Sequence, residues 1–157
     1  MTENTNINET PKVGDADVFI STDKVLLEID VVHNFLKTSY WAEHIPIEIV
    51  EKAINNSHCF GVYEGKSQVG FARVVTDYVS FAYIADLFII PEKQGRGLGK
   101  KLMTSIMNAP EFADLRRWHL ITSDAQELYK QFGFNTPTKP NCHMEIRKQD
   151  IYQPKKG

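Results

Sequence analysis

The stretch that decides the fold runs from residue 91 to residue 103 and reads PEKQGRGLGKKLM. Its glycines, Gly95, Gly97 and Gly99, stand at alternate positions among four positive charges, directly after the apolar run FAYIADLFII (81–90). Where a strand leads into a helix, the first N–H groups of the helix have no internal acceptor, and the helix dipole favours an anion there. Glycine also lets a bulky anion approach the backbone. The pattern predicts a phosphate-binding loop. The alternative is a plain tight turn, for which one glycine would suffice.

Two common nucleotide-binding motifs do not fit this loop. A Walker loop requires GxxxxGK[ST], but Gln94 lies five residues before Gly99, and Lys101 stands where serine or threonine is needed. A dinucleotide fingerprint requires GxGxxG in an early βαβ unit, whereas this spacing is GxGxG and several predicted elements precede it. The ligand is therefore a phosphate compound of another class.

The rest of the chain alternates between helical and strand periodicity. Apolar residues at helical spacing predict a helix with Leu27, Val31 and Phe35, capped at 21–23, and alternating β-rich runs flank a turn at 64–66. The expected elements, in order, are a strand at 17–21, helices over 24–36 and 46–55, strands at 59–63, 67–76 and 81–90, a helix at 98–109, a strand at 116–122, a helix at 124–132, and a last strand or strands at Phe134 and 142–148. This order predicts a mixed α/β sheet in one domain.

Composition excludes several classes of function. With a net charge of −2 in 157 residues, broad charge-driven binding to nucleic acid is not expected. Cys59 and Cys142 are far apart in the sequence, so we expect two buried thiols and no metal site. Neither a signal pattern nor an apolar run of about 20 residues is present, so we expect a cytoplasmic protein without membrane contact. Residues 1–15 and 151–157 are expected to be polar tails around a domain at 16–150.

Two motifs in register resemble those of one enzyme family. Gln94–Gly99 reads QGRGLG, matching [Q/R]-x-x-G-x-[G/A], and AQELYKQFGF (125–134) matches A-x-x-L-Y-x-x-x-G-F. With the order of elements, they make residues 16–148 resemble the GCN5-related N-acetyltransferase (GNAT) superfamily. The resemblance implies a mixed sheet of about six to seven strands with a splayed central strand pair, about four flanking helices, and acetyl-CoA as cosubstrate.

The resemblance also implies where acetyl-CoA would bind. Its pantetheine arm would hydrogen-bond to the unpaired backbone of Leu87, Phe88 and Ile89. Its diphosphate would lie on the N–H groups of Gln94–Gly99, with Lys100 as a further contact. The helix face of the second motif, with Ala125, Leu128 and Phe132, would turn toward the cofactor. The expected cofactor-binding residues are Leu87, Phe88, Ile89, Gln94, Gly95, Arg96, Gly97, Leu98, Gly99, Lys100, Ala125, Leu128 and Phe132.

Catalytic roles are assigned in the same way. The N–H of Ile89 would stabilise the oxyanion. Tyr129 would protonate the departing thiolate, the alternative being a packed aromatic ring. Asp86, the one carboxylate in 81–90, would act as the base or else serve as a hydrogen-bonded structural acid, and His119 is a second candidate for the base.

The acceptor is expected to bind at the loop between the first two helices. Tyr40 and Trp41 of this loop either line a substrate pocket or form a hydrophobic contact that closes the space between the two helices. The sequence thus predicts direct transfer of acetyl to a primary amine, on a small molecule. The alternatives are an acyl-CoA sensor or partner-binding module on the same scaffold, or an enzyme acting on protein amines. The sequence leaves the oligomeric state open, a homodimer included.

Overall fold

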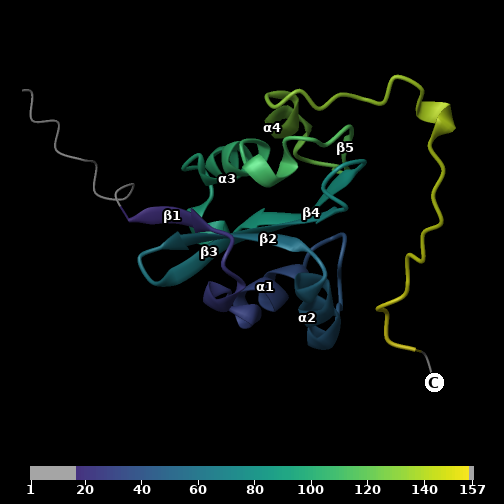
Figure 1. Cartoon of the computed structure of the whole chain (residues 1–157). Coiled ribbons are helices and arrows are strands. Elements are labelled where there is room, and N and C mark those ends of the chain that lie inside the picture. The colour runs from purple at the N-terminus through teal and green to yellow at the C-terminus, as the bar shows by residue number, and fades with distance from the viewer. Residues whose placement is uncertain (1–16, 156–157) are drawn as a thin grey trace, which may run out of the picture.

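The computed structural model describes residues 17–155, and the expected tail at 1–15 lies outside them. Five strands form one sheet in the order β1-β2-β3-β4-β5. Figure 1 shows α1 and α2 on one face of this sheet and α3 and α4 on the other. The elements are β1 Val18–Ser21, α1 Ile29–Leu36, α2 Ile47–Asn55, β2 His58–Glu64, β3 Ser67–Thr76, β4 Ala82–Ile89, α3 Leu98–Met107, β5 Trp118–Leu120 and α4 Gln126–Lys130, with short 3-10 turns η1 Lys24–Leu26, η2 Pro91–Lys93, η3 Pro110–Phe112 and η4 Pro140–Cys142. The mixed α/β class and the four helices are as predicted.

A hydrophobic core fills each face of the sheet. On one face, Leu102 and Ile106 of α3 are fully buried against the strands. On the other, Val32 of α1 and Val50 of α2 are buried with Phe71 of β3. These helices therefore form because each buries one apolar stripe, and the sheet is apolar on both faces.

The first helix begins later than predicted. The Asp23 side chain accepts a hydrogen bond from the N–H of Val25 at 3.0 Å, so it caps the short turn η1. The α-helix itself starts at Ile29, and Glu28 makes no side-chain cap. The second helix follows Pro46 as expected, because proline suits a helix start.

The sheet is antiparallel except at one junction. β1, β2, β3 and β4 pair in antiparallel fashion, and the β2–β3 hairpin turns through Gly65 at φ +59°. β4 and β5 run parallel, and their pairing covers only Ala82–Ile84 with Trp118–Leu120. Beyond Ile84, the edge of β4 that faces β5 has no pairing strand among residues 17–155, as the splayed pair requires.

The predicted last strands are not formed, and the predicted count of six to seven strands is therefore too high for the described chain. Phe134 and residues 142–148 lie in no strand. After α4 the chain continues as an extended C-terminal arm, residues 139–155, along one side of the body (Figure 1). A strand needs a partner edge to form, and the N–H groups of residues 144–149 donate to no backbone carbonyl within 17–155. Cys142, expected to be buried, is exposed on this arm, whereas Cys59 is buried.

No helix within residues 17–155 combines the length and the apolarity needed to cross a lipid bilayer.

Candidate active site

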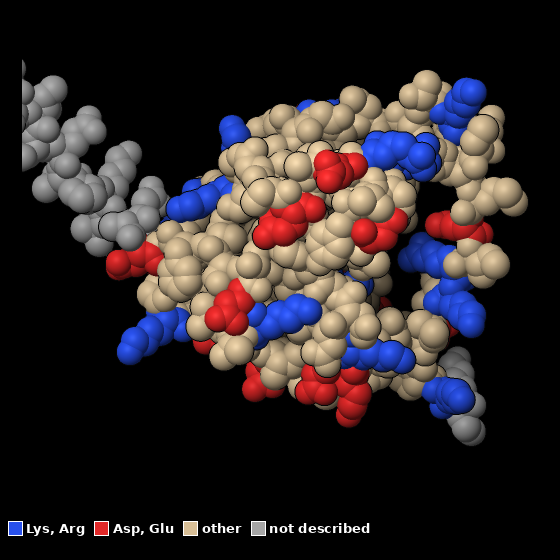
Figure 2. Space-filling model, in the orientation of Figure 1, with Lys and Arg blue, Asp and Glu red and all other residues tan. Residues whose placement is uncertain are grey.

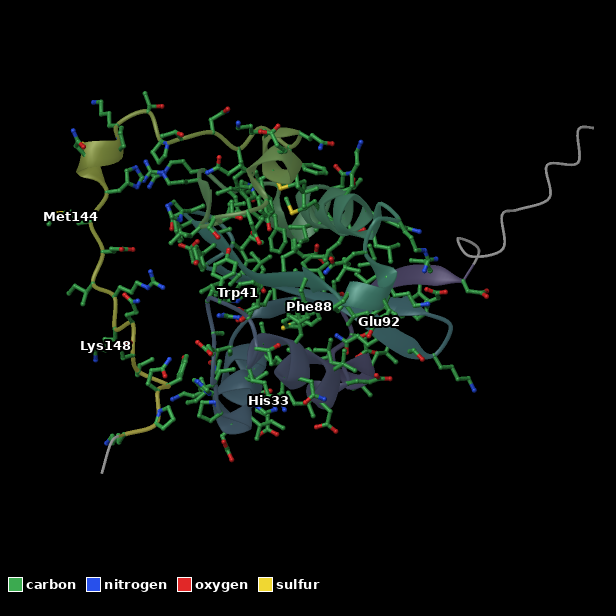
Figure 3. The ribbon with its side chains drawn as sticks, turned by 180° about the vertical axis from the view of Figure 1, so that it is seen from behind. His33, Trp41, Phe88, Glu92, Met144 and Lys148 are labelled. Carbon is green, nitrogen blue, oxygen red and sulfur yellow. The ribbon has the colours of Figure 1, made fainter. Side chains whose placement is uncertain are left out.

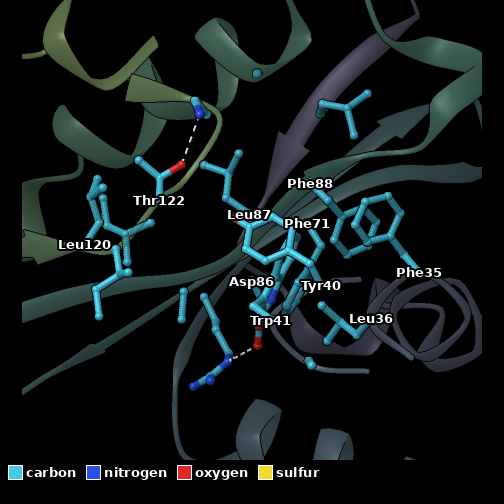
Figure 4. A pocket seen from close by; sticks show the side chains of 18 of the residues that line it. Phe35, Leu36, Tyr40, Trp41, Phe71, Asp86, Leu87, Phe88, Leu120 and Thr122 are labelled. Atoms are coloured by element: carbon cyan, nitrogen blue, oxygen red, sulfur yellow. Dashed lines mark hydrogen bonds and ion pairs between the residues drawn. The ribbon is translucent and has the colours of Figure 1, made fainter. Parts of the chain in front are cut away.

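One cavity of about 960 Å³ opens where β4 and β5 separate. Its wall brings together the end of β4, the glycine loop, α4 and the loop between α1 and α2, which are far apart in the sequence. Figure 4 shows Tyr40, Trp41, Asp86 and Phe88 projecting into this region, with Leu120 and Thr122 across from them.

A bulge in β4 shapes the cavity floor. Phe71 pairs with Phe88, but Arg73 pairs with Ala85, so β4 carries one more residue than β3 over this interval. Asp86 lies in the bulge with a φ of +54°, a conformation that non-glycine residues rarely adopt. Bulges of this kind bend a strand and re-aim a side chain. Here the bulge turns the Asp86 carboxylate into the cavity.

The open seam exposes backbone groups of β4. The N–H of Ile90 donates to the carbonyl of Val69 at 2.9 Å and therefore points toward β3. Because the polar groups of successive residues alternate along a strand, the N–H of Ile89 points the other way, toward the seam. The Ile89 carbonyl on that side accepts a hydrogen bond from Nε2 of Gln94 at 2.9 Å. Ile89 thus offers a backbone donor to the cavity.

The glycine loop also presents backbone donors. Gly95 and Gly97 adopt φ values of +80° and +76°, which exclude most other residues, and a Cβ at either position would meet no atom within 4 Å. Gly97 is the N-cap of α3, and the first helical bond runs from the N–H of Lys101 to its carbonyl. The N–H groups of residues 98–100 therefore have no acceptor within the helix. An anion fits this position.

The positive charges of the loop are partly neutralised. Nη1 of Arg96 lies 2.7 Å from Oε2 of Glu64, and Nζ of Lys93 lies 3.4 Å from the same oxygen. These partners lower the pKa of Glu64. Nζ of Lys101 points to the carbonyl of Val18 at 3.4 Å. The attraction for an anion therefore rests more on the backbone than on the number of cations.

Tyr129 reaches the cavity from α4. The short helix begins after Ala125, whose N–H donates to Oγ1 of Thr122 at 3.0 Å, and Gly133 ends the motif at φ +91°. The Tyr129 side chain is 8% exposed. Burial raises its pKa to about 12, with smaller contributions from Tyr40 and Asp124. The phenol is thus protonated at neutral pH.

Two aromatic residues bridge the loop after α1 to the other walls. Nε1 of Trp41 donates to Oδ1 of Asp86 at 2.9 Å. The hydroxyl of Tyr40 contacts Oδ1 of Asp124 at 3.4 Å and accepts from the N–H of Ser123 at 3.3 Å. Both rings line the cavity. They contribute to its wall and do not plug the helix pair, where Val32, Leu36 and Val50 are buried instead.

Arg73 is a site residue that the sequence reasoning missed. Its Nε lies 2.5 Å from Oδ2 of Asp86, and its Nη1 donates to Oγ of Ser57 at 3.2 Å. The pair is largely shielded from solvent. A lone arginine in one apolar strand and a lone aspartate in the next could have been matched as an ion pair, because each needs a partner when buried.

Not every predicted site residue lies on the cavity wall. Arg96 lies on the exposed surface of the loop, Lys100 lies on the exposed surface of α3, and Phe132 packs against the core beside α4. His119 lies on β5 outside the wall, with its ring stacked on Tyr83 at 5.9 Å between centroids. The predicted residues that do line the cavity are Tyr40, Trp41, Asp86, Leu87, Phe88, Ile89, Gln94, Gly95, Gly97, Leu98, Gly99, Ala125, Leu128 and Tyr129. Within residues 17–155, no group of three His, Cys, Asp or Glu side chains could hold a metal ion.

Comparison with known families and proteins identifies relatives of this chain. The family described as "Acetyltransferase (GNAT) domain" matches residues 55–136. A protein of Gibberella zeae that bears the name "Putative acetyltransferase FG08082" is 31% identical over 145 residues, which cover 79% of this chain and 82% of that protein.

Solved structures share the fold. The crystal structure of a GNAT-family protein from Xanthomonas campestris pv. campestris superposes with a TM-score of 0.85 at 43% identity, covering 87% of this chain and 97% of that one. A GNAT-family acetyltransferase from Elizabethkingia anophelis, solved with acetyl-CoA bound, gives a TM-score of 0.61 at 12% identity over 78% of each chain. At that identity, the second likeness shows the fold alone.

Proposed function

We propose how this chain, which belongs to the GNAT family of acetyltransferases, performs its reaction: it transfers acetyl from acetyl-CoA directly to a primary amine of a small molecule. One observation carries the proposal. A single cavity joins the backbone donors of the glycine loop, the open edge of β4 and the buried hydroxyl-bearing side chain of Tyr129. The Elizabethkingia anophelis relative carries acetyl-CoA, which makes the same cosubstrate a natural choice for this site.

The proposed cofactor half runs from the seam to the start of α3. The N–H groups of 95–99 bind the diphosphate, and the N–H of Gln94 is left out of the expected set because it already donates to the carbonyl of Pro91 at 3.3 Å. The seam-facing backbone of Leu87 and Ile89 binds the pantetheine group as an added strand would. Ala125 and Leu128, at α4, cover the pantetheine group. The Leu128 side chain lies in van der Waals range of Gly99, 3.7 Å from the position that a Cβ would take there. Acetyl-CoA supplies the thioester-activated acetyl group.

Three groups of this chain then act on the reaction. The N–H of Ile89 donates to the carbonyl oxygen as that oxygen gains negative charge. The Asp86 carboxylate accepts the proton that the amine must lose, directly or through a water molecule. The Tyr129 hydroxyl gives its proton to the departing sulfur, since a phenol with a pKa of about 12 holds that proton at neutral pH.

The acceptor half suggests the kind of amine. Its wall holds the rings of Tyr40 and Trp41, and Phe35 stacks on Phe88 at 4.0 Å between ring centroids. Asp86 and Asp124 add carboxylates near these rings. A cationic amine with an apolar or aromatic body suits such a wall, because the rings attract the cation and bury the body.

The experiment is a screen of small amines for thiol release from acetyl-CoA by the purified protein. We expect turnover with primary amines that carry an apolar body, and little with acidic amines such as glutamate. The matched control is the Gly97→Glu variant, which keeps the acceptor half but places a carboxylate against the diphosphate. Cofactor binding without turnover on any amine or amine-bearing peptide would contradict the proposal and leave a sensor.

A further inference from the structure

A single carboxylate at the end of β2 holds two cations of the glycine loop. Oε2 of Glu64 lies 2.7 Å from Nη1 of Arg96 and 3.4 Å from Nζ of Lys93. The hydrogen bond from Arg96, and then the one from Lys93, lower the pKa of Glu64, which is therefore ionised at neutral pH. Glu64 thus places a permanent negative charge beside a loop that otherwise suits an anion.

The β2–β3 hairpin fixes the position of this carboxylate. Glu64 pairs with Val18 of β1 on one side and with Ser67 of β3 on the other. The next residue, Gly65, donates from its N–H to the carbonyl of Asp17 at 3.0 Å. The backbone of residue 64 is therefore held on both sides, whereas lysine and arginine side chains rotate about several bonds. The cations of the loop can change partner, and the carboxylate stays in place.

Lys93 is the cation best placed to reach a ligand in the cavity. Of the four cations in residues 93–101, all within the described chain, Lys93 alone lies on the cavity wall. Nζ of Lys101 instead points to the carbonyl of Val18 at 3.4 Å, on the strand that pairs with β2. The cation that could contact a phosphate in the cavity is therefore one of the two that Glu64 holds.

The surroundings supply little additional positive charge. On the face shown in Figure 2, acidic and basic side chains of the described residues are interspersed and form no continuous basic surface. Figure 3 shows Glu92, the neighbour of Lys93 in η2, on the side of the body opposite the arm that carries Met144 and Lys148. The basic residues of the arm therefore lie away from the loop. The ion pairs of Lys93 and Arg96 thus have a large share in how strongly the side chains attract a phosphate.

A carboxylate and a phosphate compete for the same cations. A lysine or arginine that is paired with Glu64 must give up this partner, or share it, before it contacts a phosphate. Partly exposed ion pairs are weak enough to exchange, but their loss subtracts from the affinity for the incoming anion. An acetyltransferase must release coenzyme A after each turnover, and product release limits the rate of many enzymes. A carboxylate that weakens the phosphate contacts would serve this release.

We propose that Glu64 withholds Lys93 and Arg96 from the diphosphate, and thereby lowers the affinity for coenzyme A and speeds its release. The inference rests on the proposed function, because it takes the glycine loop as the diphosphate site. Glu64 acts through the two cations and touches neither the cofactor nor the reacting atoms, so it is a positioning residue.

The first test measures the Kd for coenzyme A by titration calorimetry. Glu64→Gln should bind about 3–10-fold more tightly than the wild type at low salt, and the gain should shrink at high salt, because both effects depend on ion pairs. Glu51→Gln, on the exposed surface of α2, removes the same charge and is the matched control with an unchanged Kd. An unchanged or weaker affinity in Glu64→Gln would overturn the inference and assign Glu64 to orienting the cations for the phosphate. A wild type that does not bind coenzyme A would instead contradict the proposed function itself.

The second test follows release directly. Stopped-flow displacement of coenzyme A should give a dissociation rate about 3–10-fold lower in Glu64→Gln, because new contacts in a complex act mainly on dissociation. An unchanged dissociation rate would contradict a role in product release.

The third test is a double-mutant cycle between Glu64 and Lys93. Lys93→Met keeps most of the aliphatic stem and removes the charge. It should weaken binding of coenzyme A more in the Glu64→Gln background than in the wild type, because only there is Lys93 released from the carboxylate. Additive effects of the two substitutions would mean that Lys93 does not exchange between Glu64 and the phosphate, and the mechanism would be wrong.

Discussion

The two halves of the cavity are built from different parts of the polypeptide. The proposed cofactor half presents backbone, namely the left-handed glycines of the loop and the seam-facing N–H of Ile89. The proposed acceptor half presents side chains, with Trp41 and Arg73 both bonded to Asp86. Backbone donors do not depend on which side chains surround them, so one half can bind a common cosubstrate while the other half varies with the amine. Substitutions should therefore separate cofactor binding from acceptor turnover.

The largest effect is expected from Gly97→Glu. The new side chain must adopt a φ of +76° and places a carboxylate at the proposed position of the diphosphate. Loss of two charge-assisted hydrogen bonds costs about 3–6 kcal/mol, which corresponds to roughly 10²–10⁴-fold weaker binding. Titration calorimetry with acetyl-CoA should show no measurable binding.

Gly65→Glu is the matched control for that variant. Gly65 has a φ of +59° in the β2–β3 turn and also has no atom within 4 Å of its Cβ direction. It should lose similar folding stability and keep its affinity for acetyl-CoA. Equal loss of binding in both variants would mean that strain, and not the position on the loop, removes the ligand.

Tyr129→Phe should reduce kcat by about 10²–10³-fold and leave the Kd for acetyl-CoA unchanged, since a general acid contributes on this scale. Wild-type turnover should show no alkaline loss from this group below about pH 11, because the raised pKa of about 12 keeps the phenol protonated. Stopped-flow thiol release over a pH series checks both expectations. Wild-type turnover in the variant would assign the proton to another donor.

Asp86→Asn should reduce kcat/KM by about 10–10²-fold, because it removes the carboxylate proposed to take the proton of the amine. Asparagine also disturbs the bonds to Trp41 and Arg73. The companion variant is therefore Arg73→Lys, which disturbs the same ion pair but keeps the Asp86 carboxylate. An equal loss of kcat/KM in both variants would mean that Asp86 holds its two neighbours in place and that the base lies elsewhere.

The smallest effect is expected on the acceptor wall. Trp41→Phe keeps an aromatic ring but removes the donor to Asp86, and we expect a rise of about 3–10-fold in the KM for the amine. The Kd for acetyl-CoA should not change. A weaker Kd for acetyl-CoA with an unchanged KM for the amine would place Trp41 on the cofactor side and break the division between the halves.

The glycine loop could be predicted from the sequence because its signals are local. Glycines at alternate positions after an apolar strand require a particular backbone, and Gly95 and Gly97 indeed adopt positive φ. The pairing of Arg73 with Asp86 joins two strands, and the contact of Tyr40 with Asp124 joins residues 84 positions apart. Such contacts depend on register and on a bulge, which periodicity does not reveal.

The terminal strands illustrate the same limit at the level of the fold. CHMEIRK has the alternation of a strand, and the prediction of a strand at 142–148 followed from it. Alternation shows that a segment can pair, whereas pairing requires an edge within reach. In the described chain, residues 142–148 pair with no strand.

The most direct measurement of the central claim is a titration of ¹⁵N-labelled protein with acetyl-CoA, followed by the amide resonances of the chain. The account predicts the largest shifts at the amides of 95–99 and of Ile89, with smaller shifts at Tyr40 and Trp41. Shifts concentrated elsewhere, with the amides of the glycine loop unmoved at saturation, would contradict it.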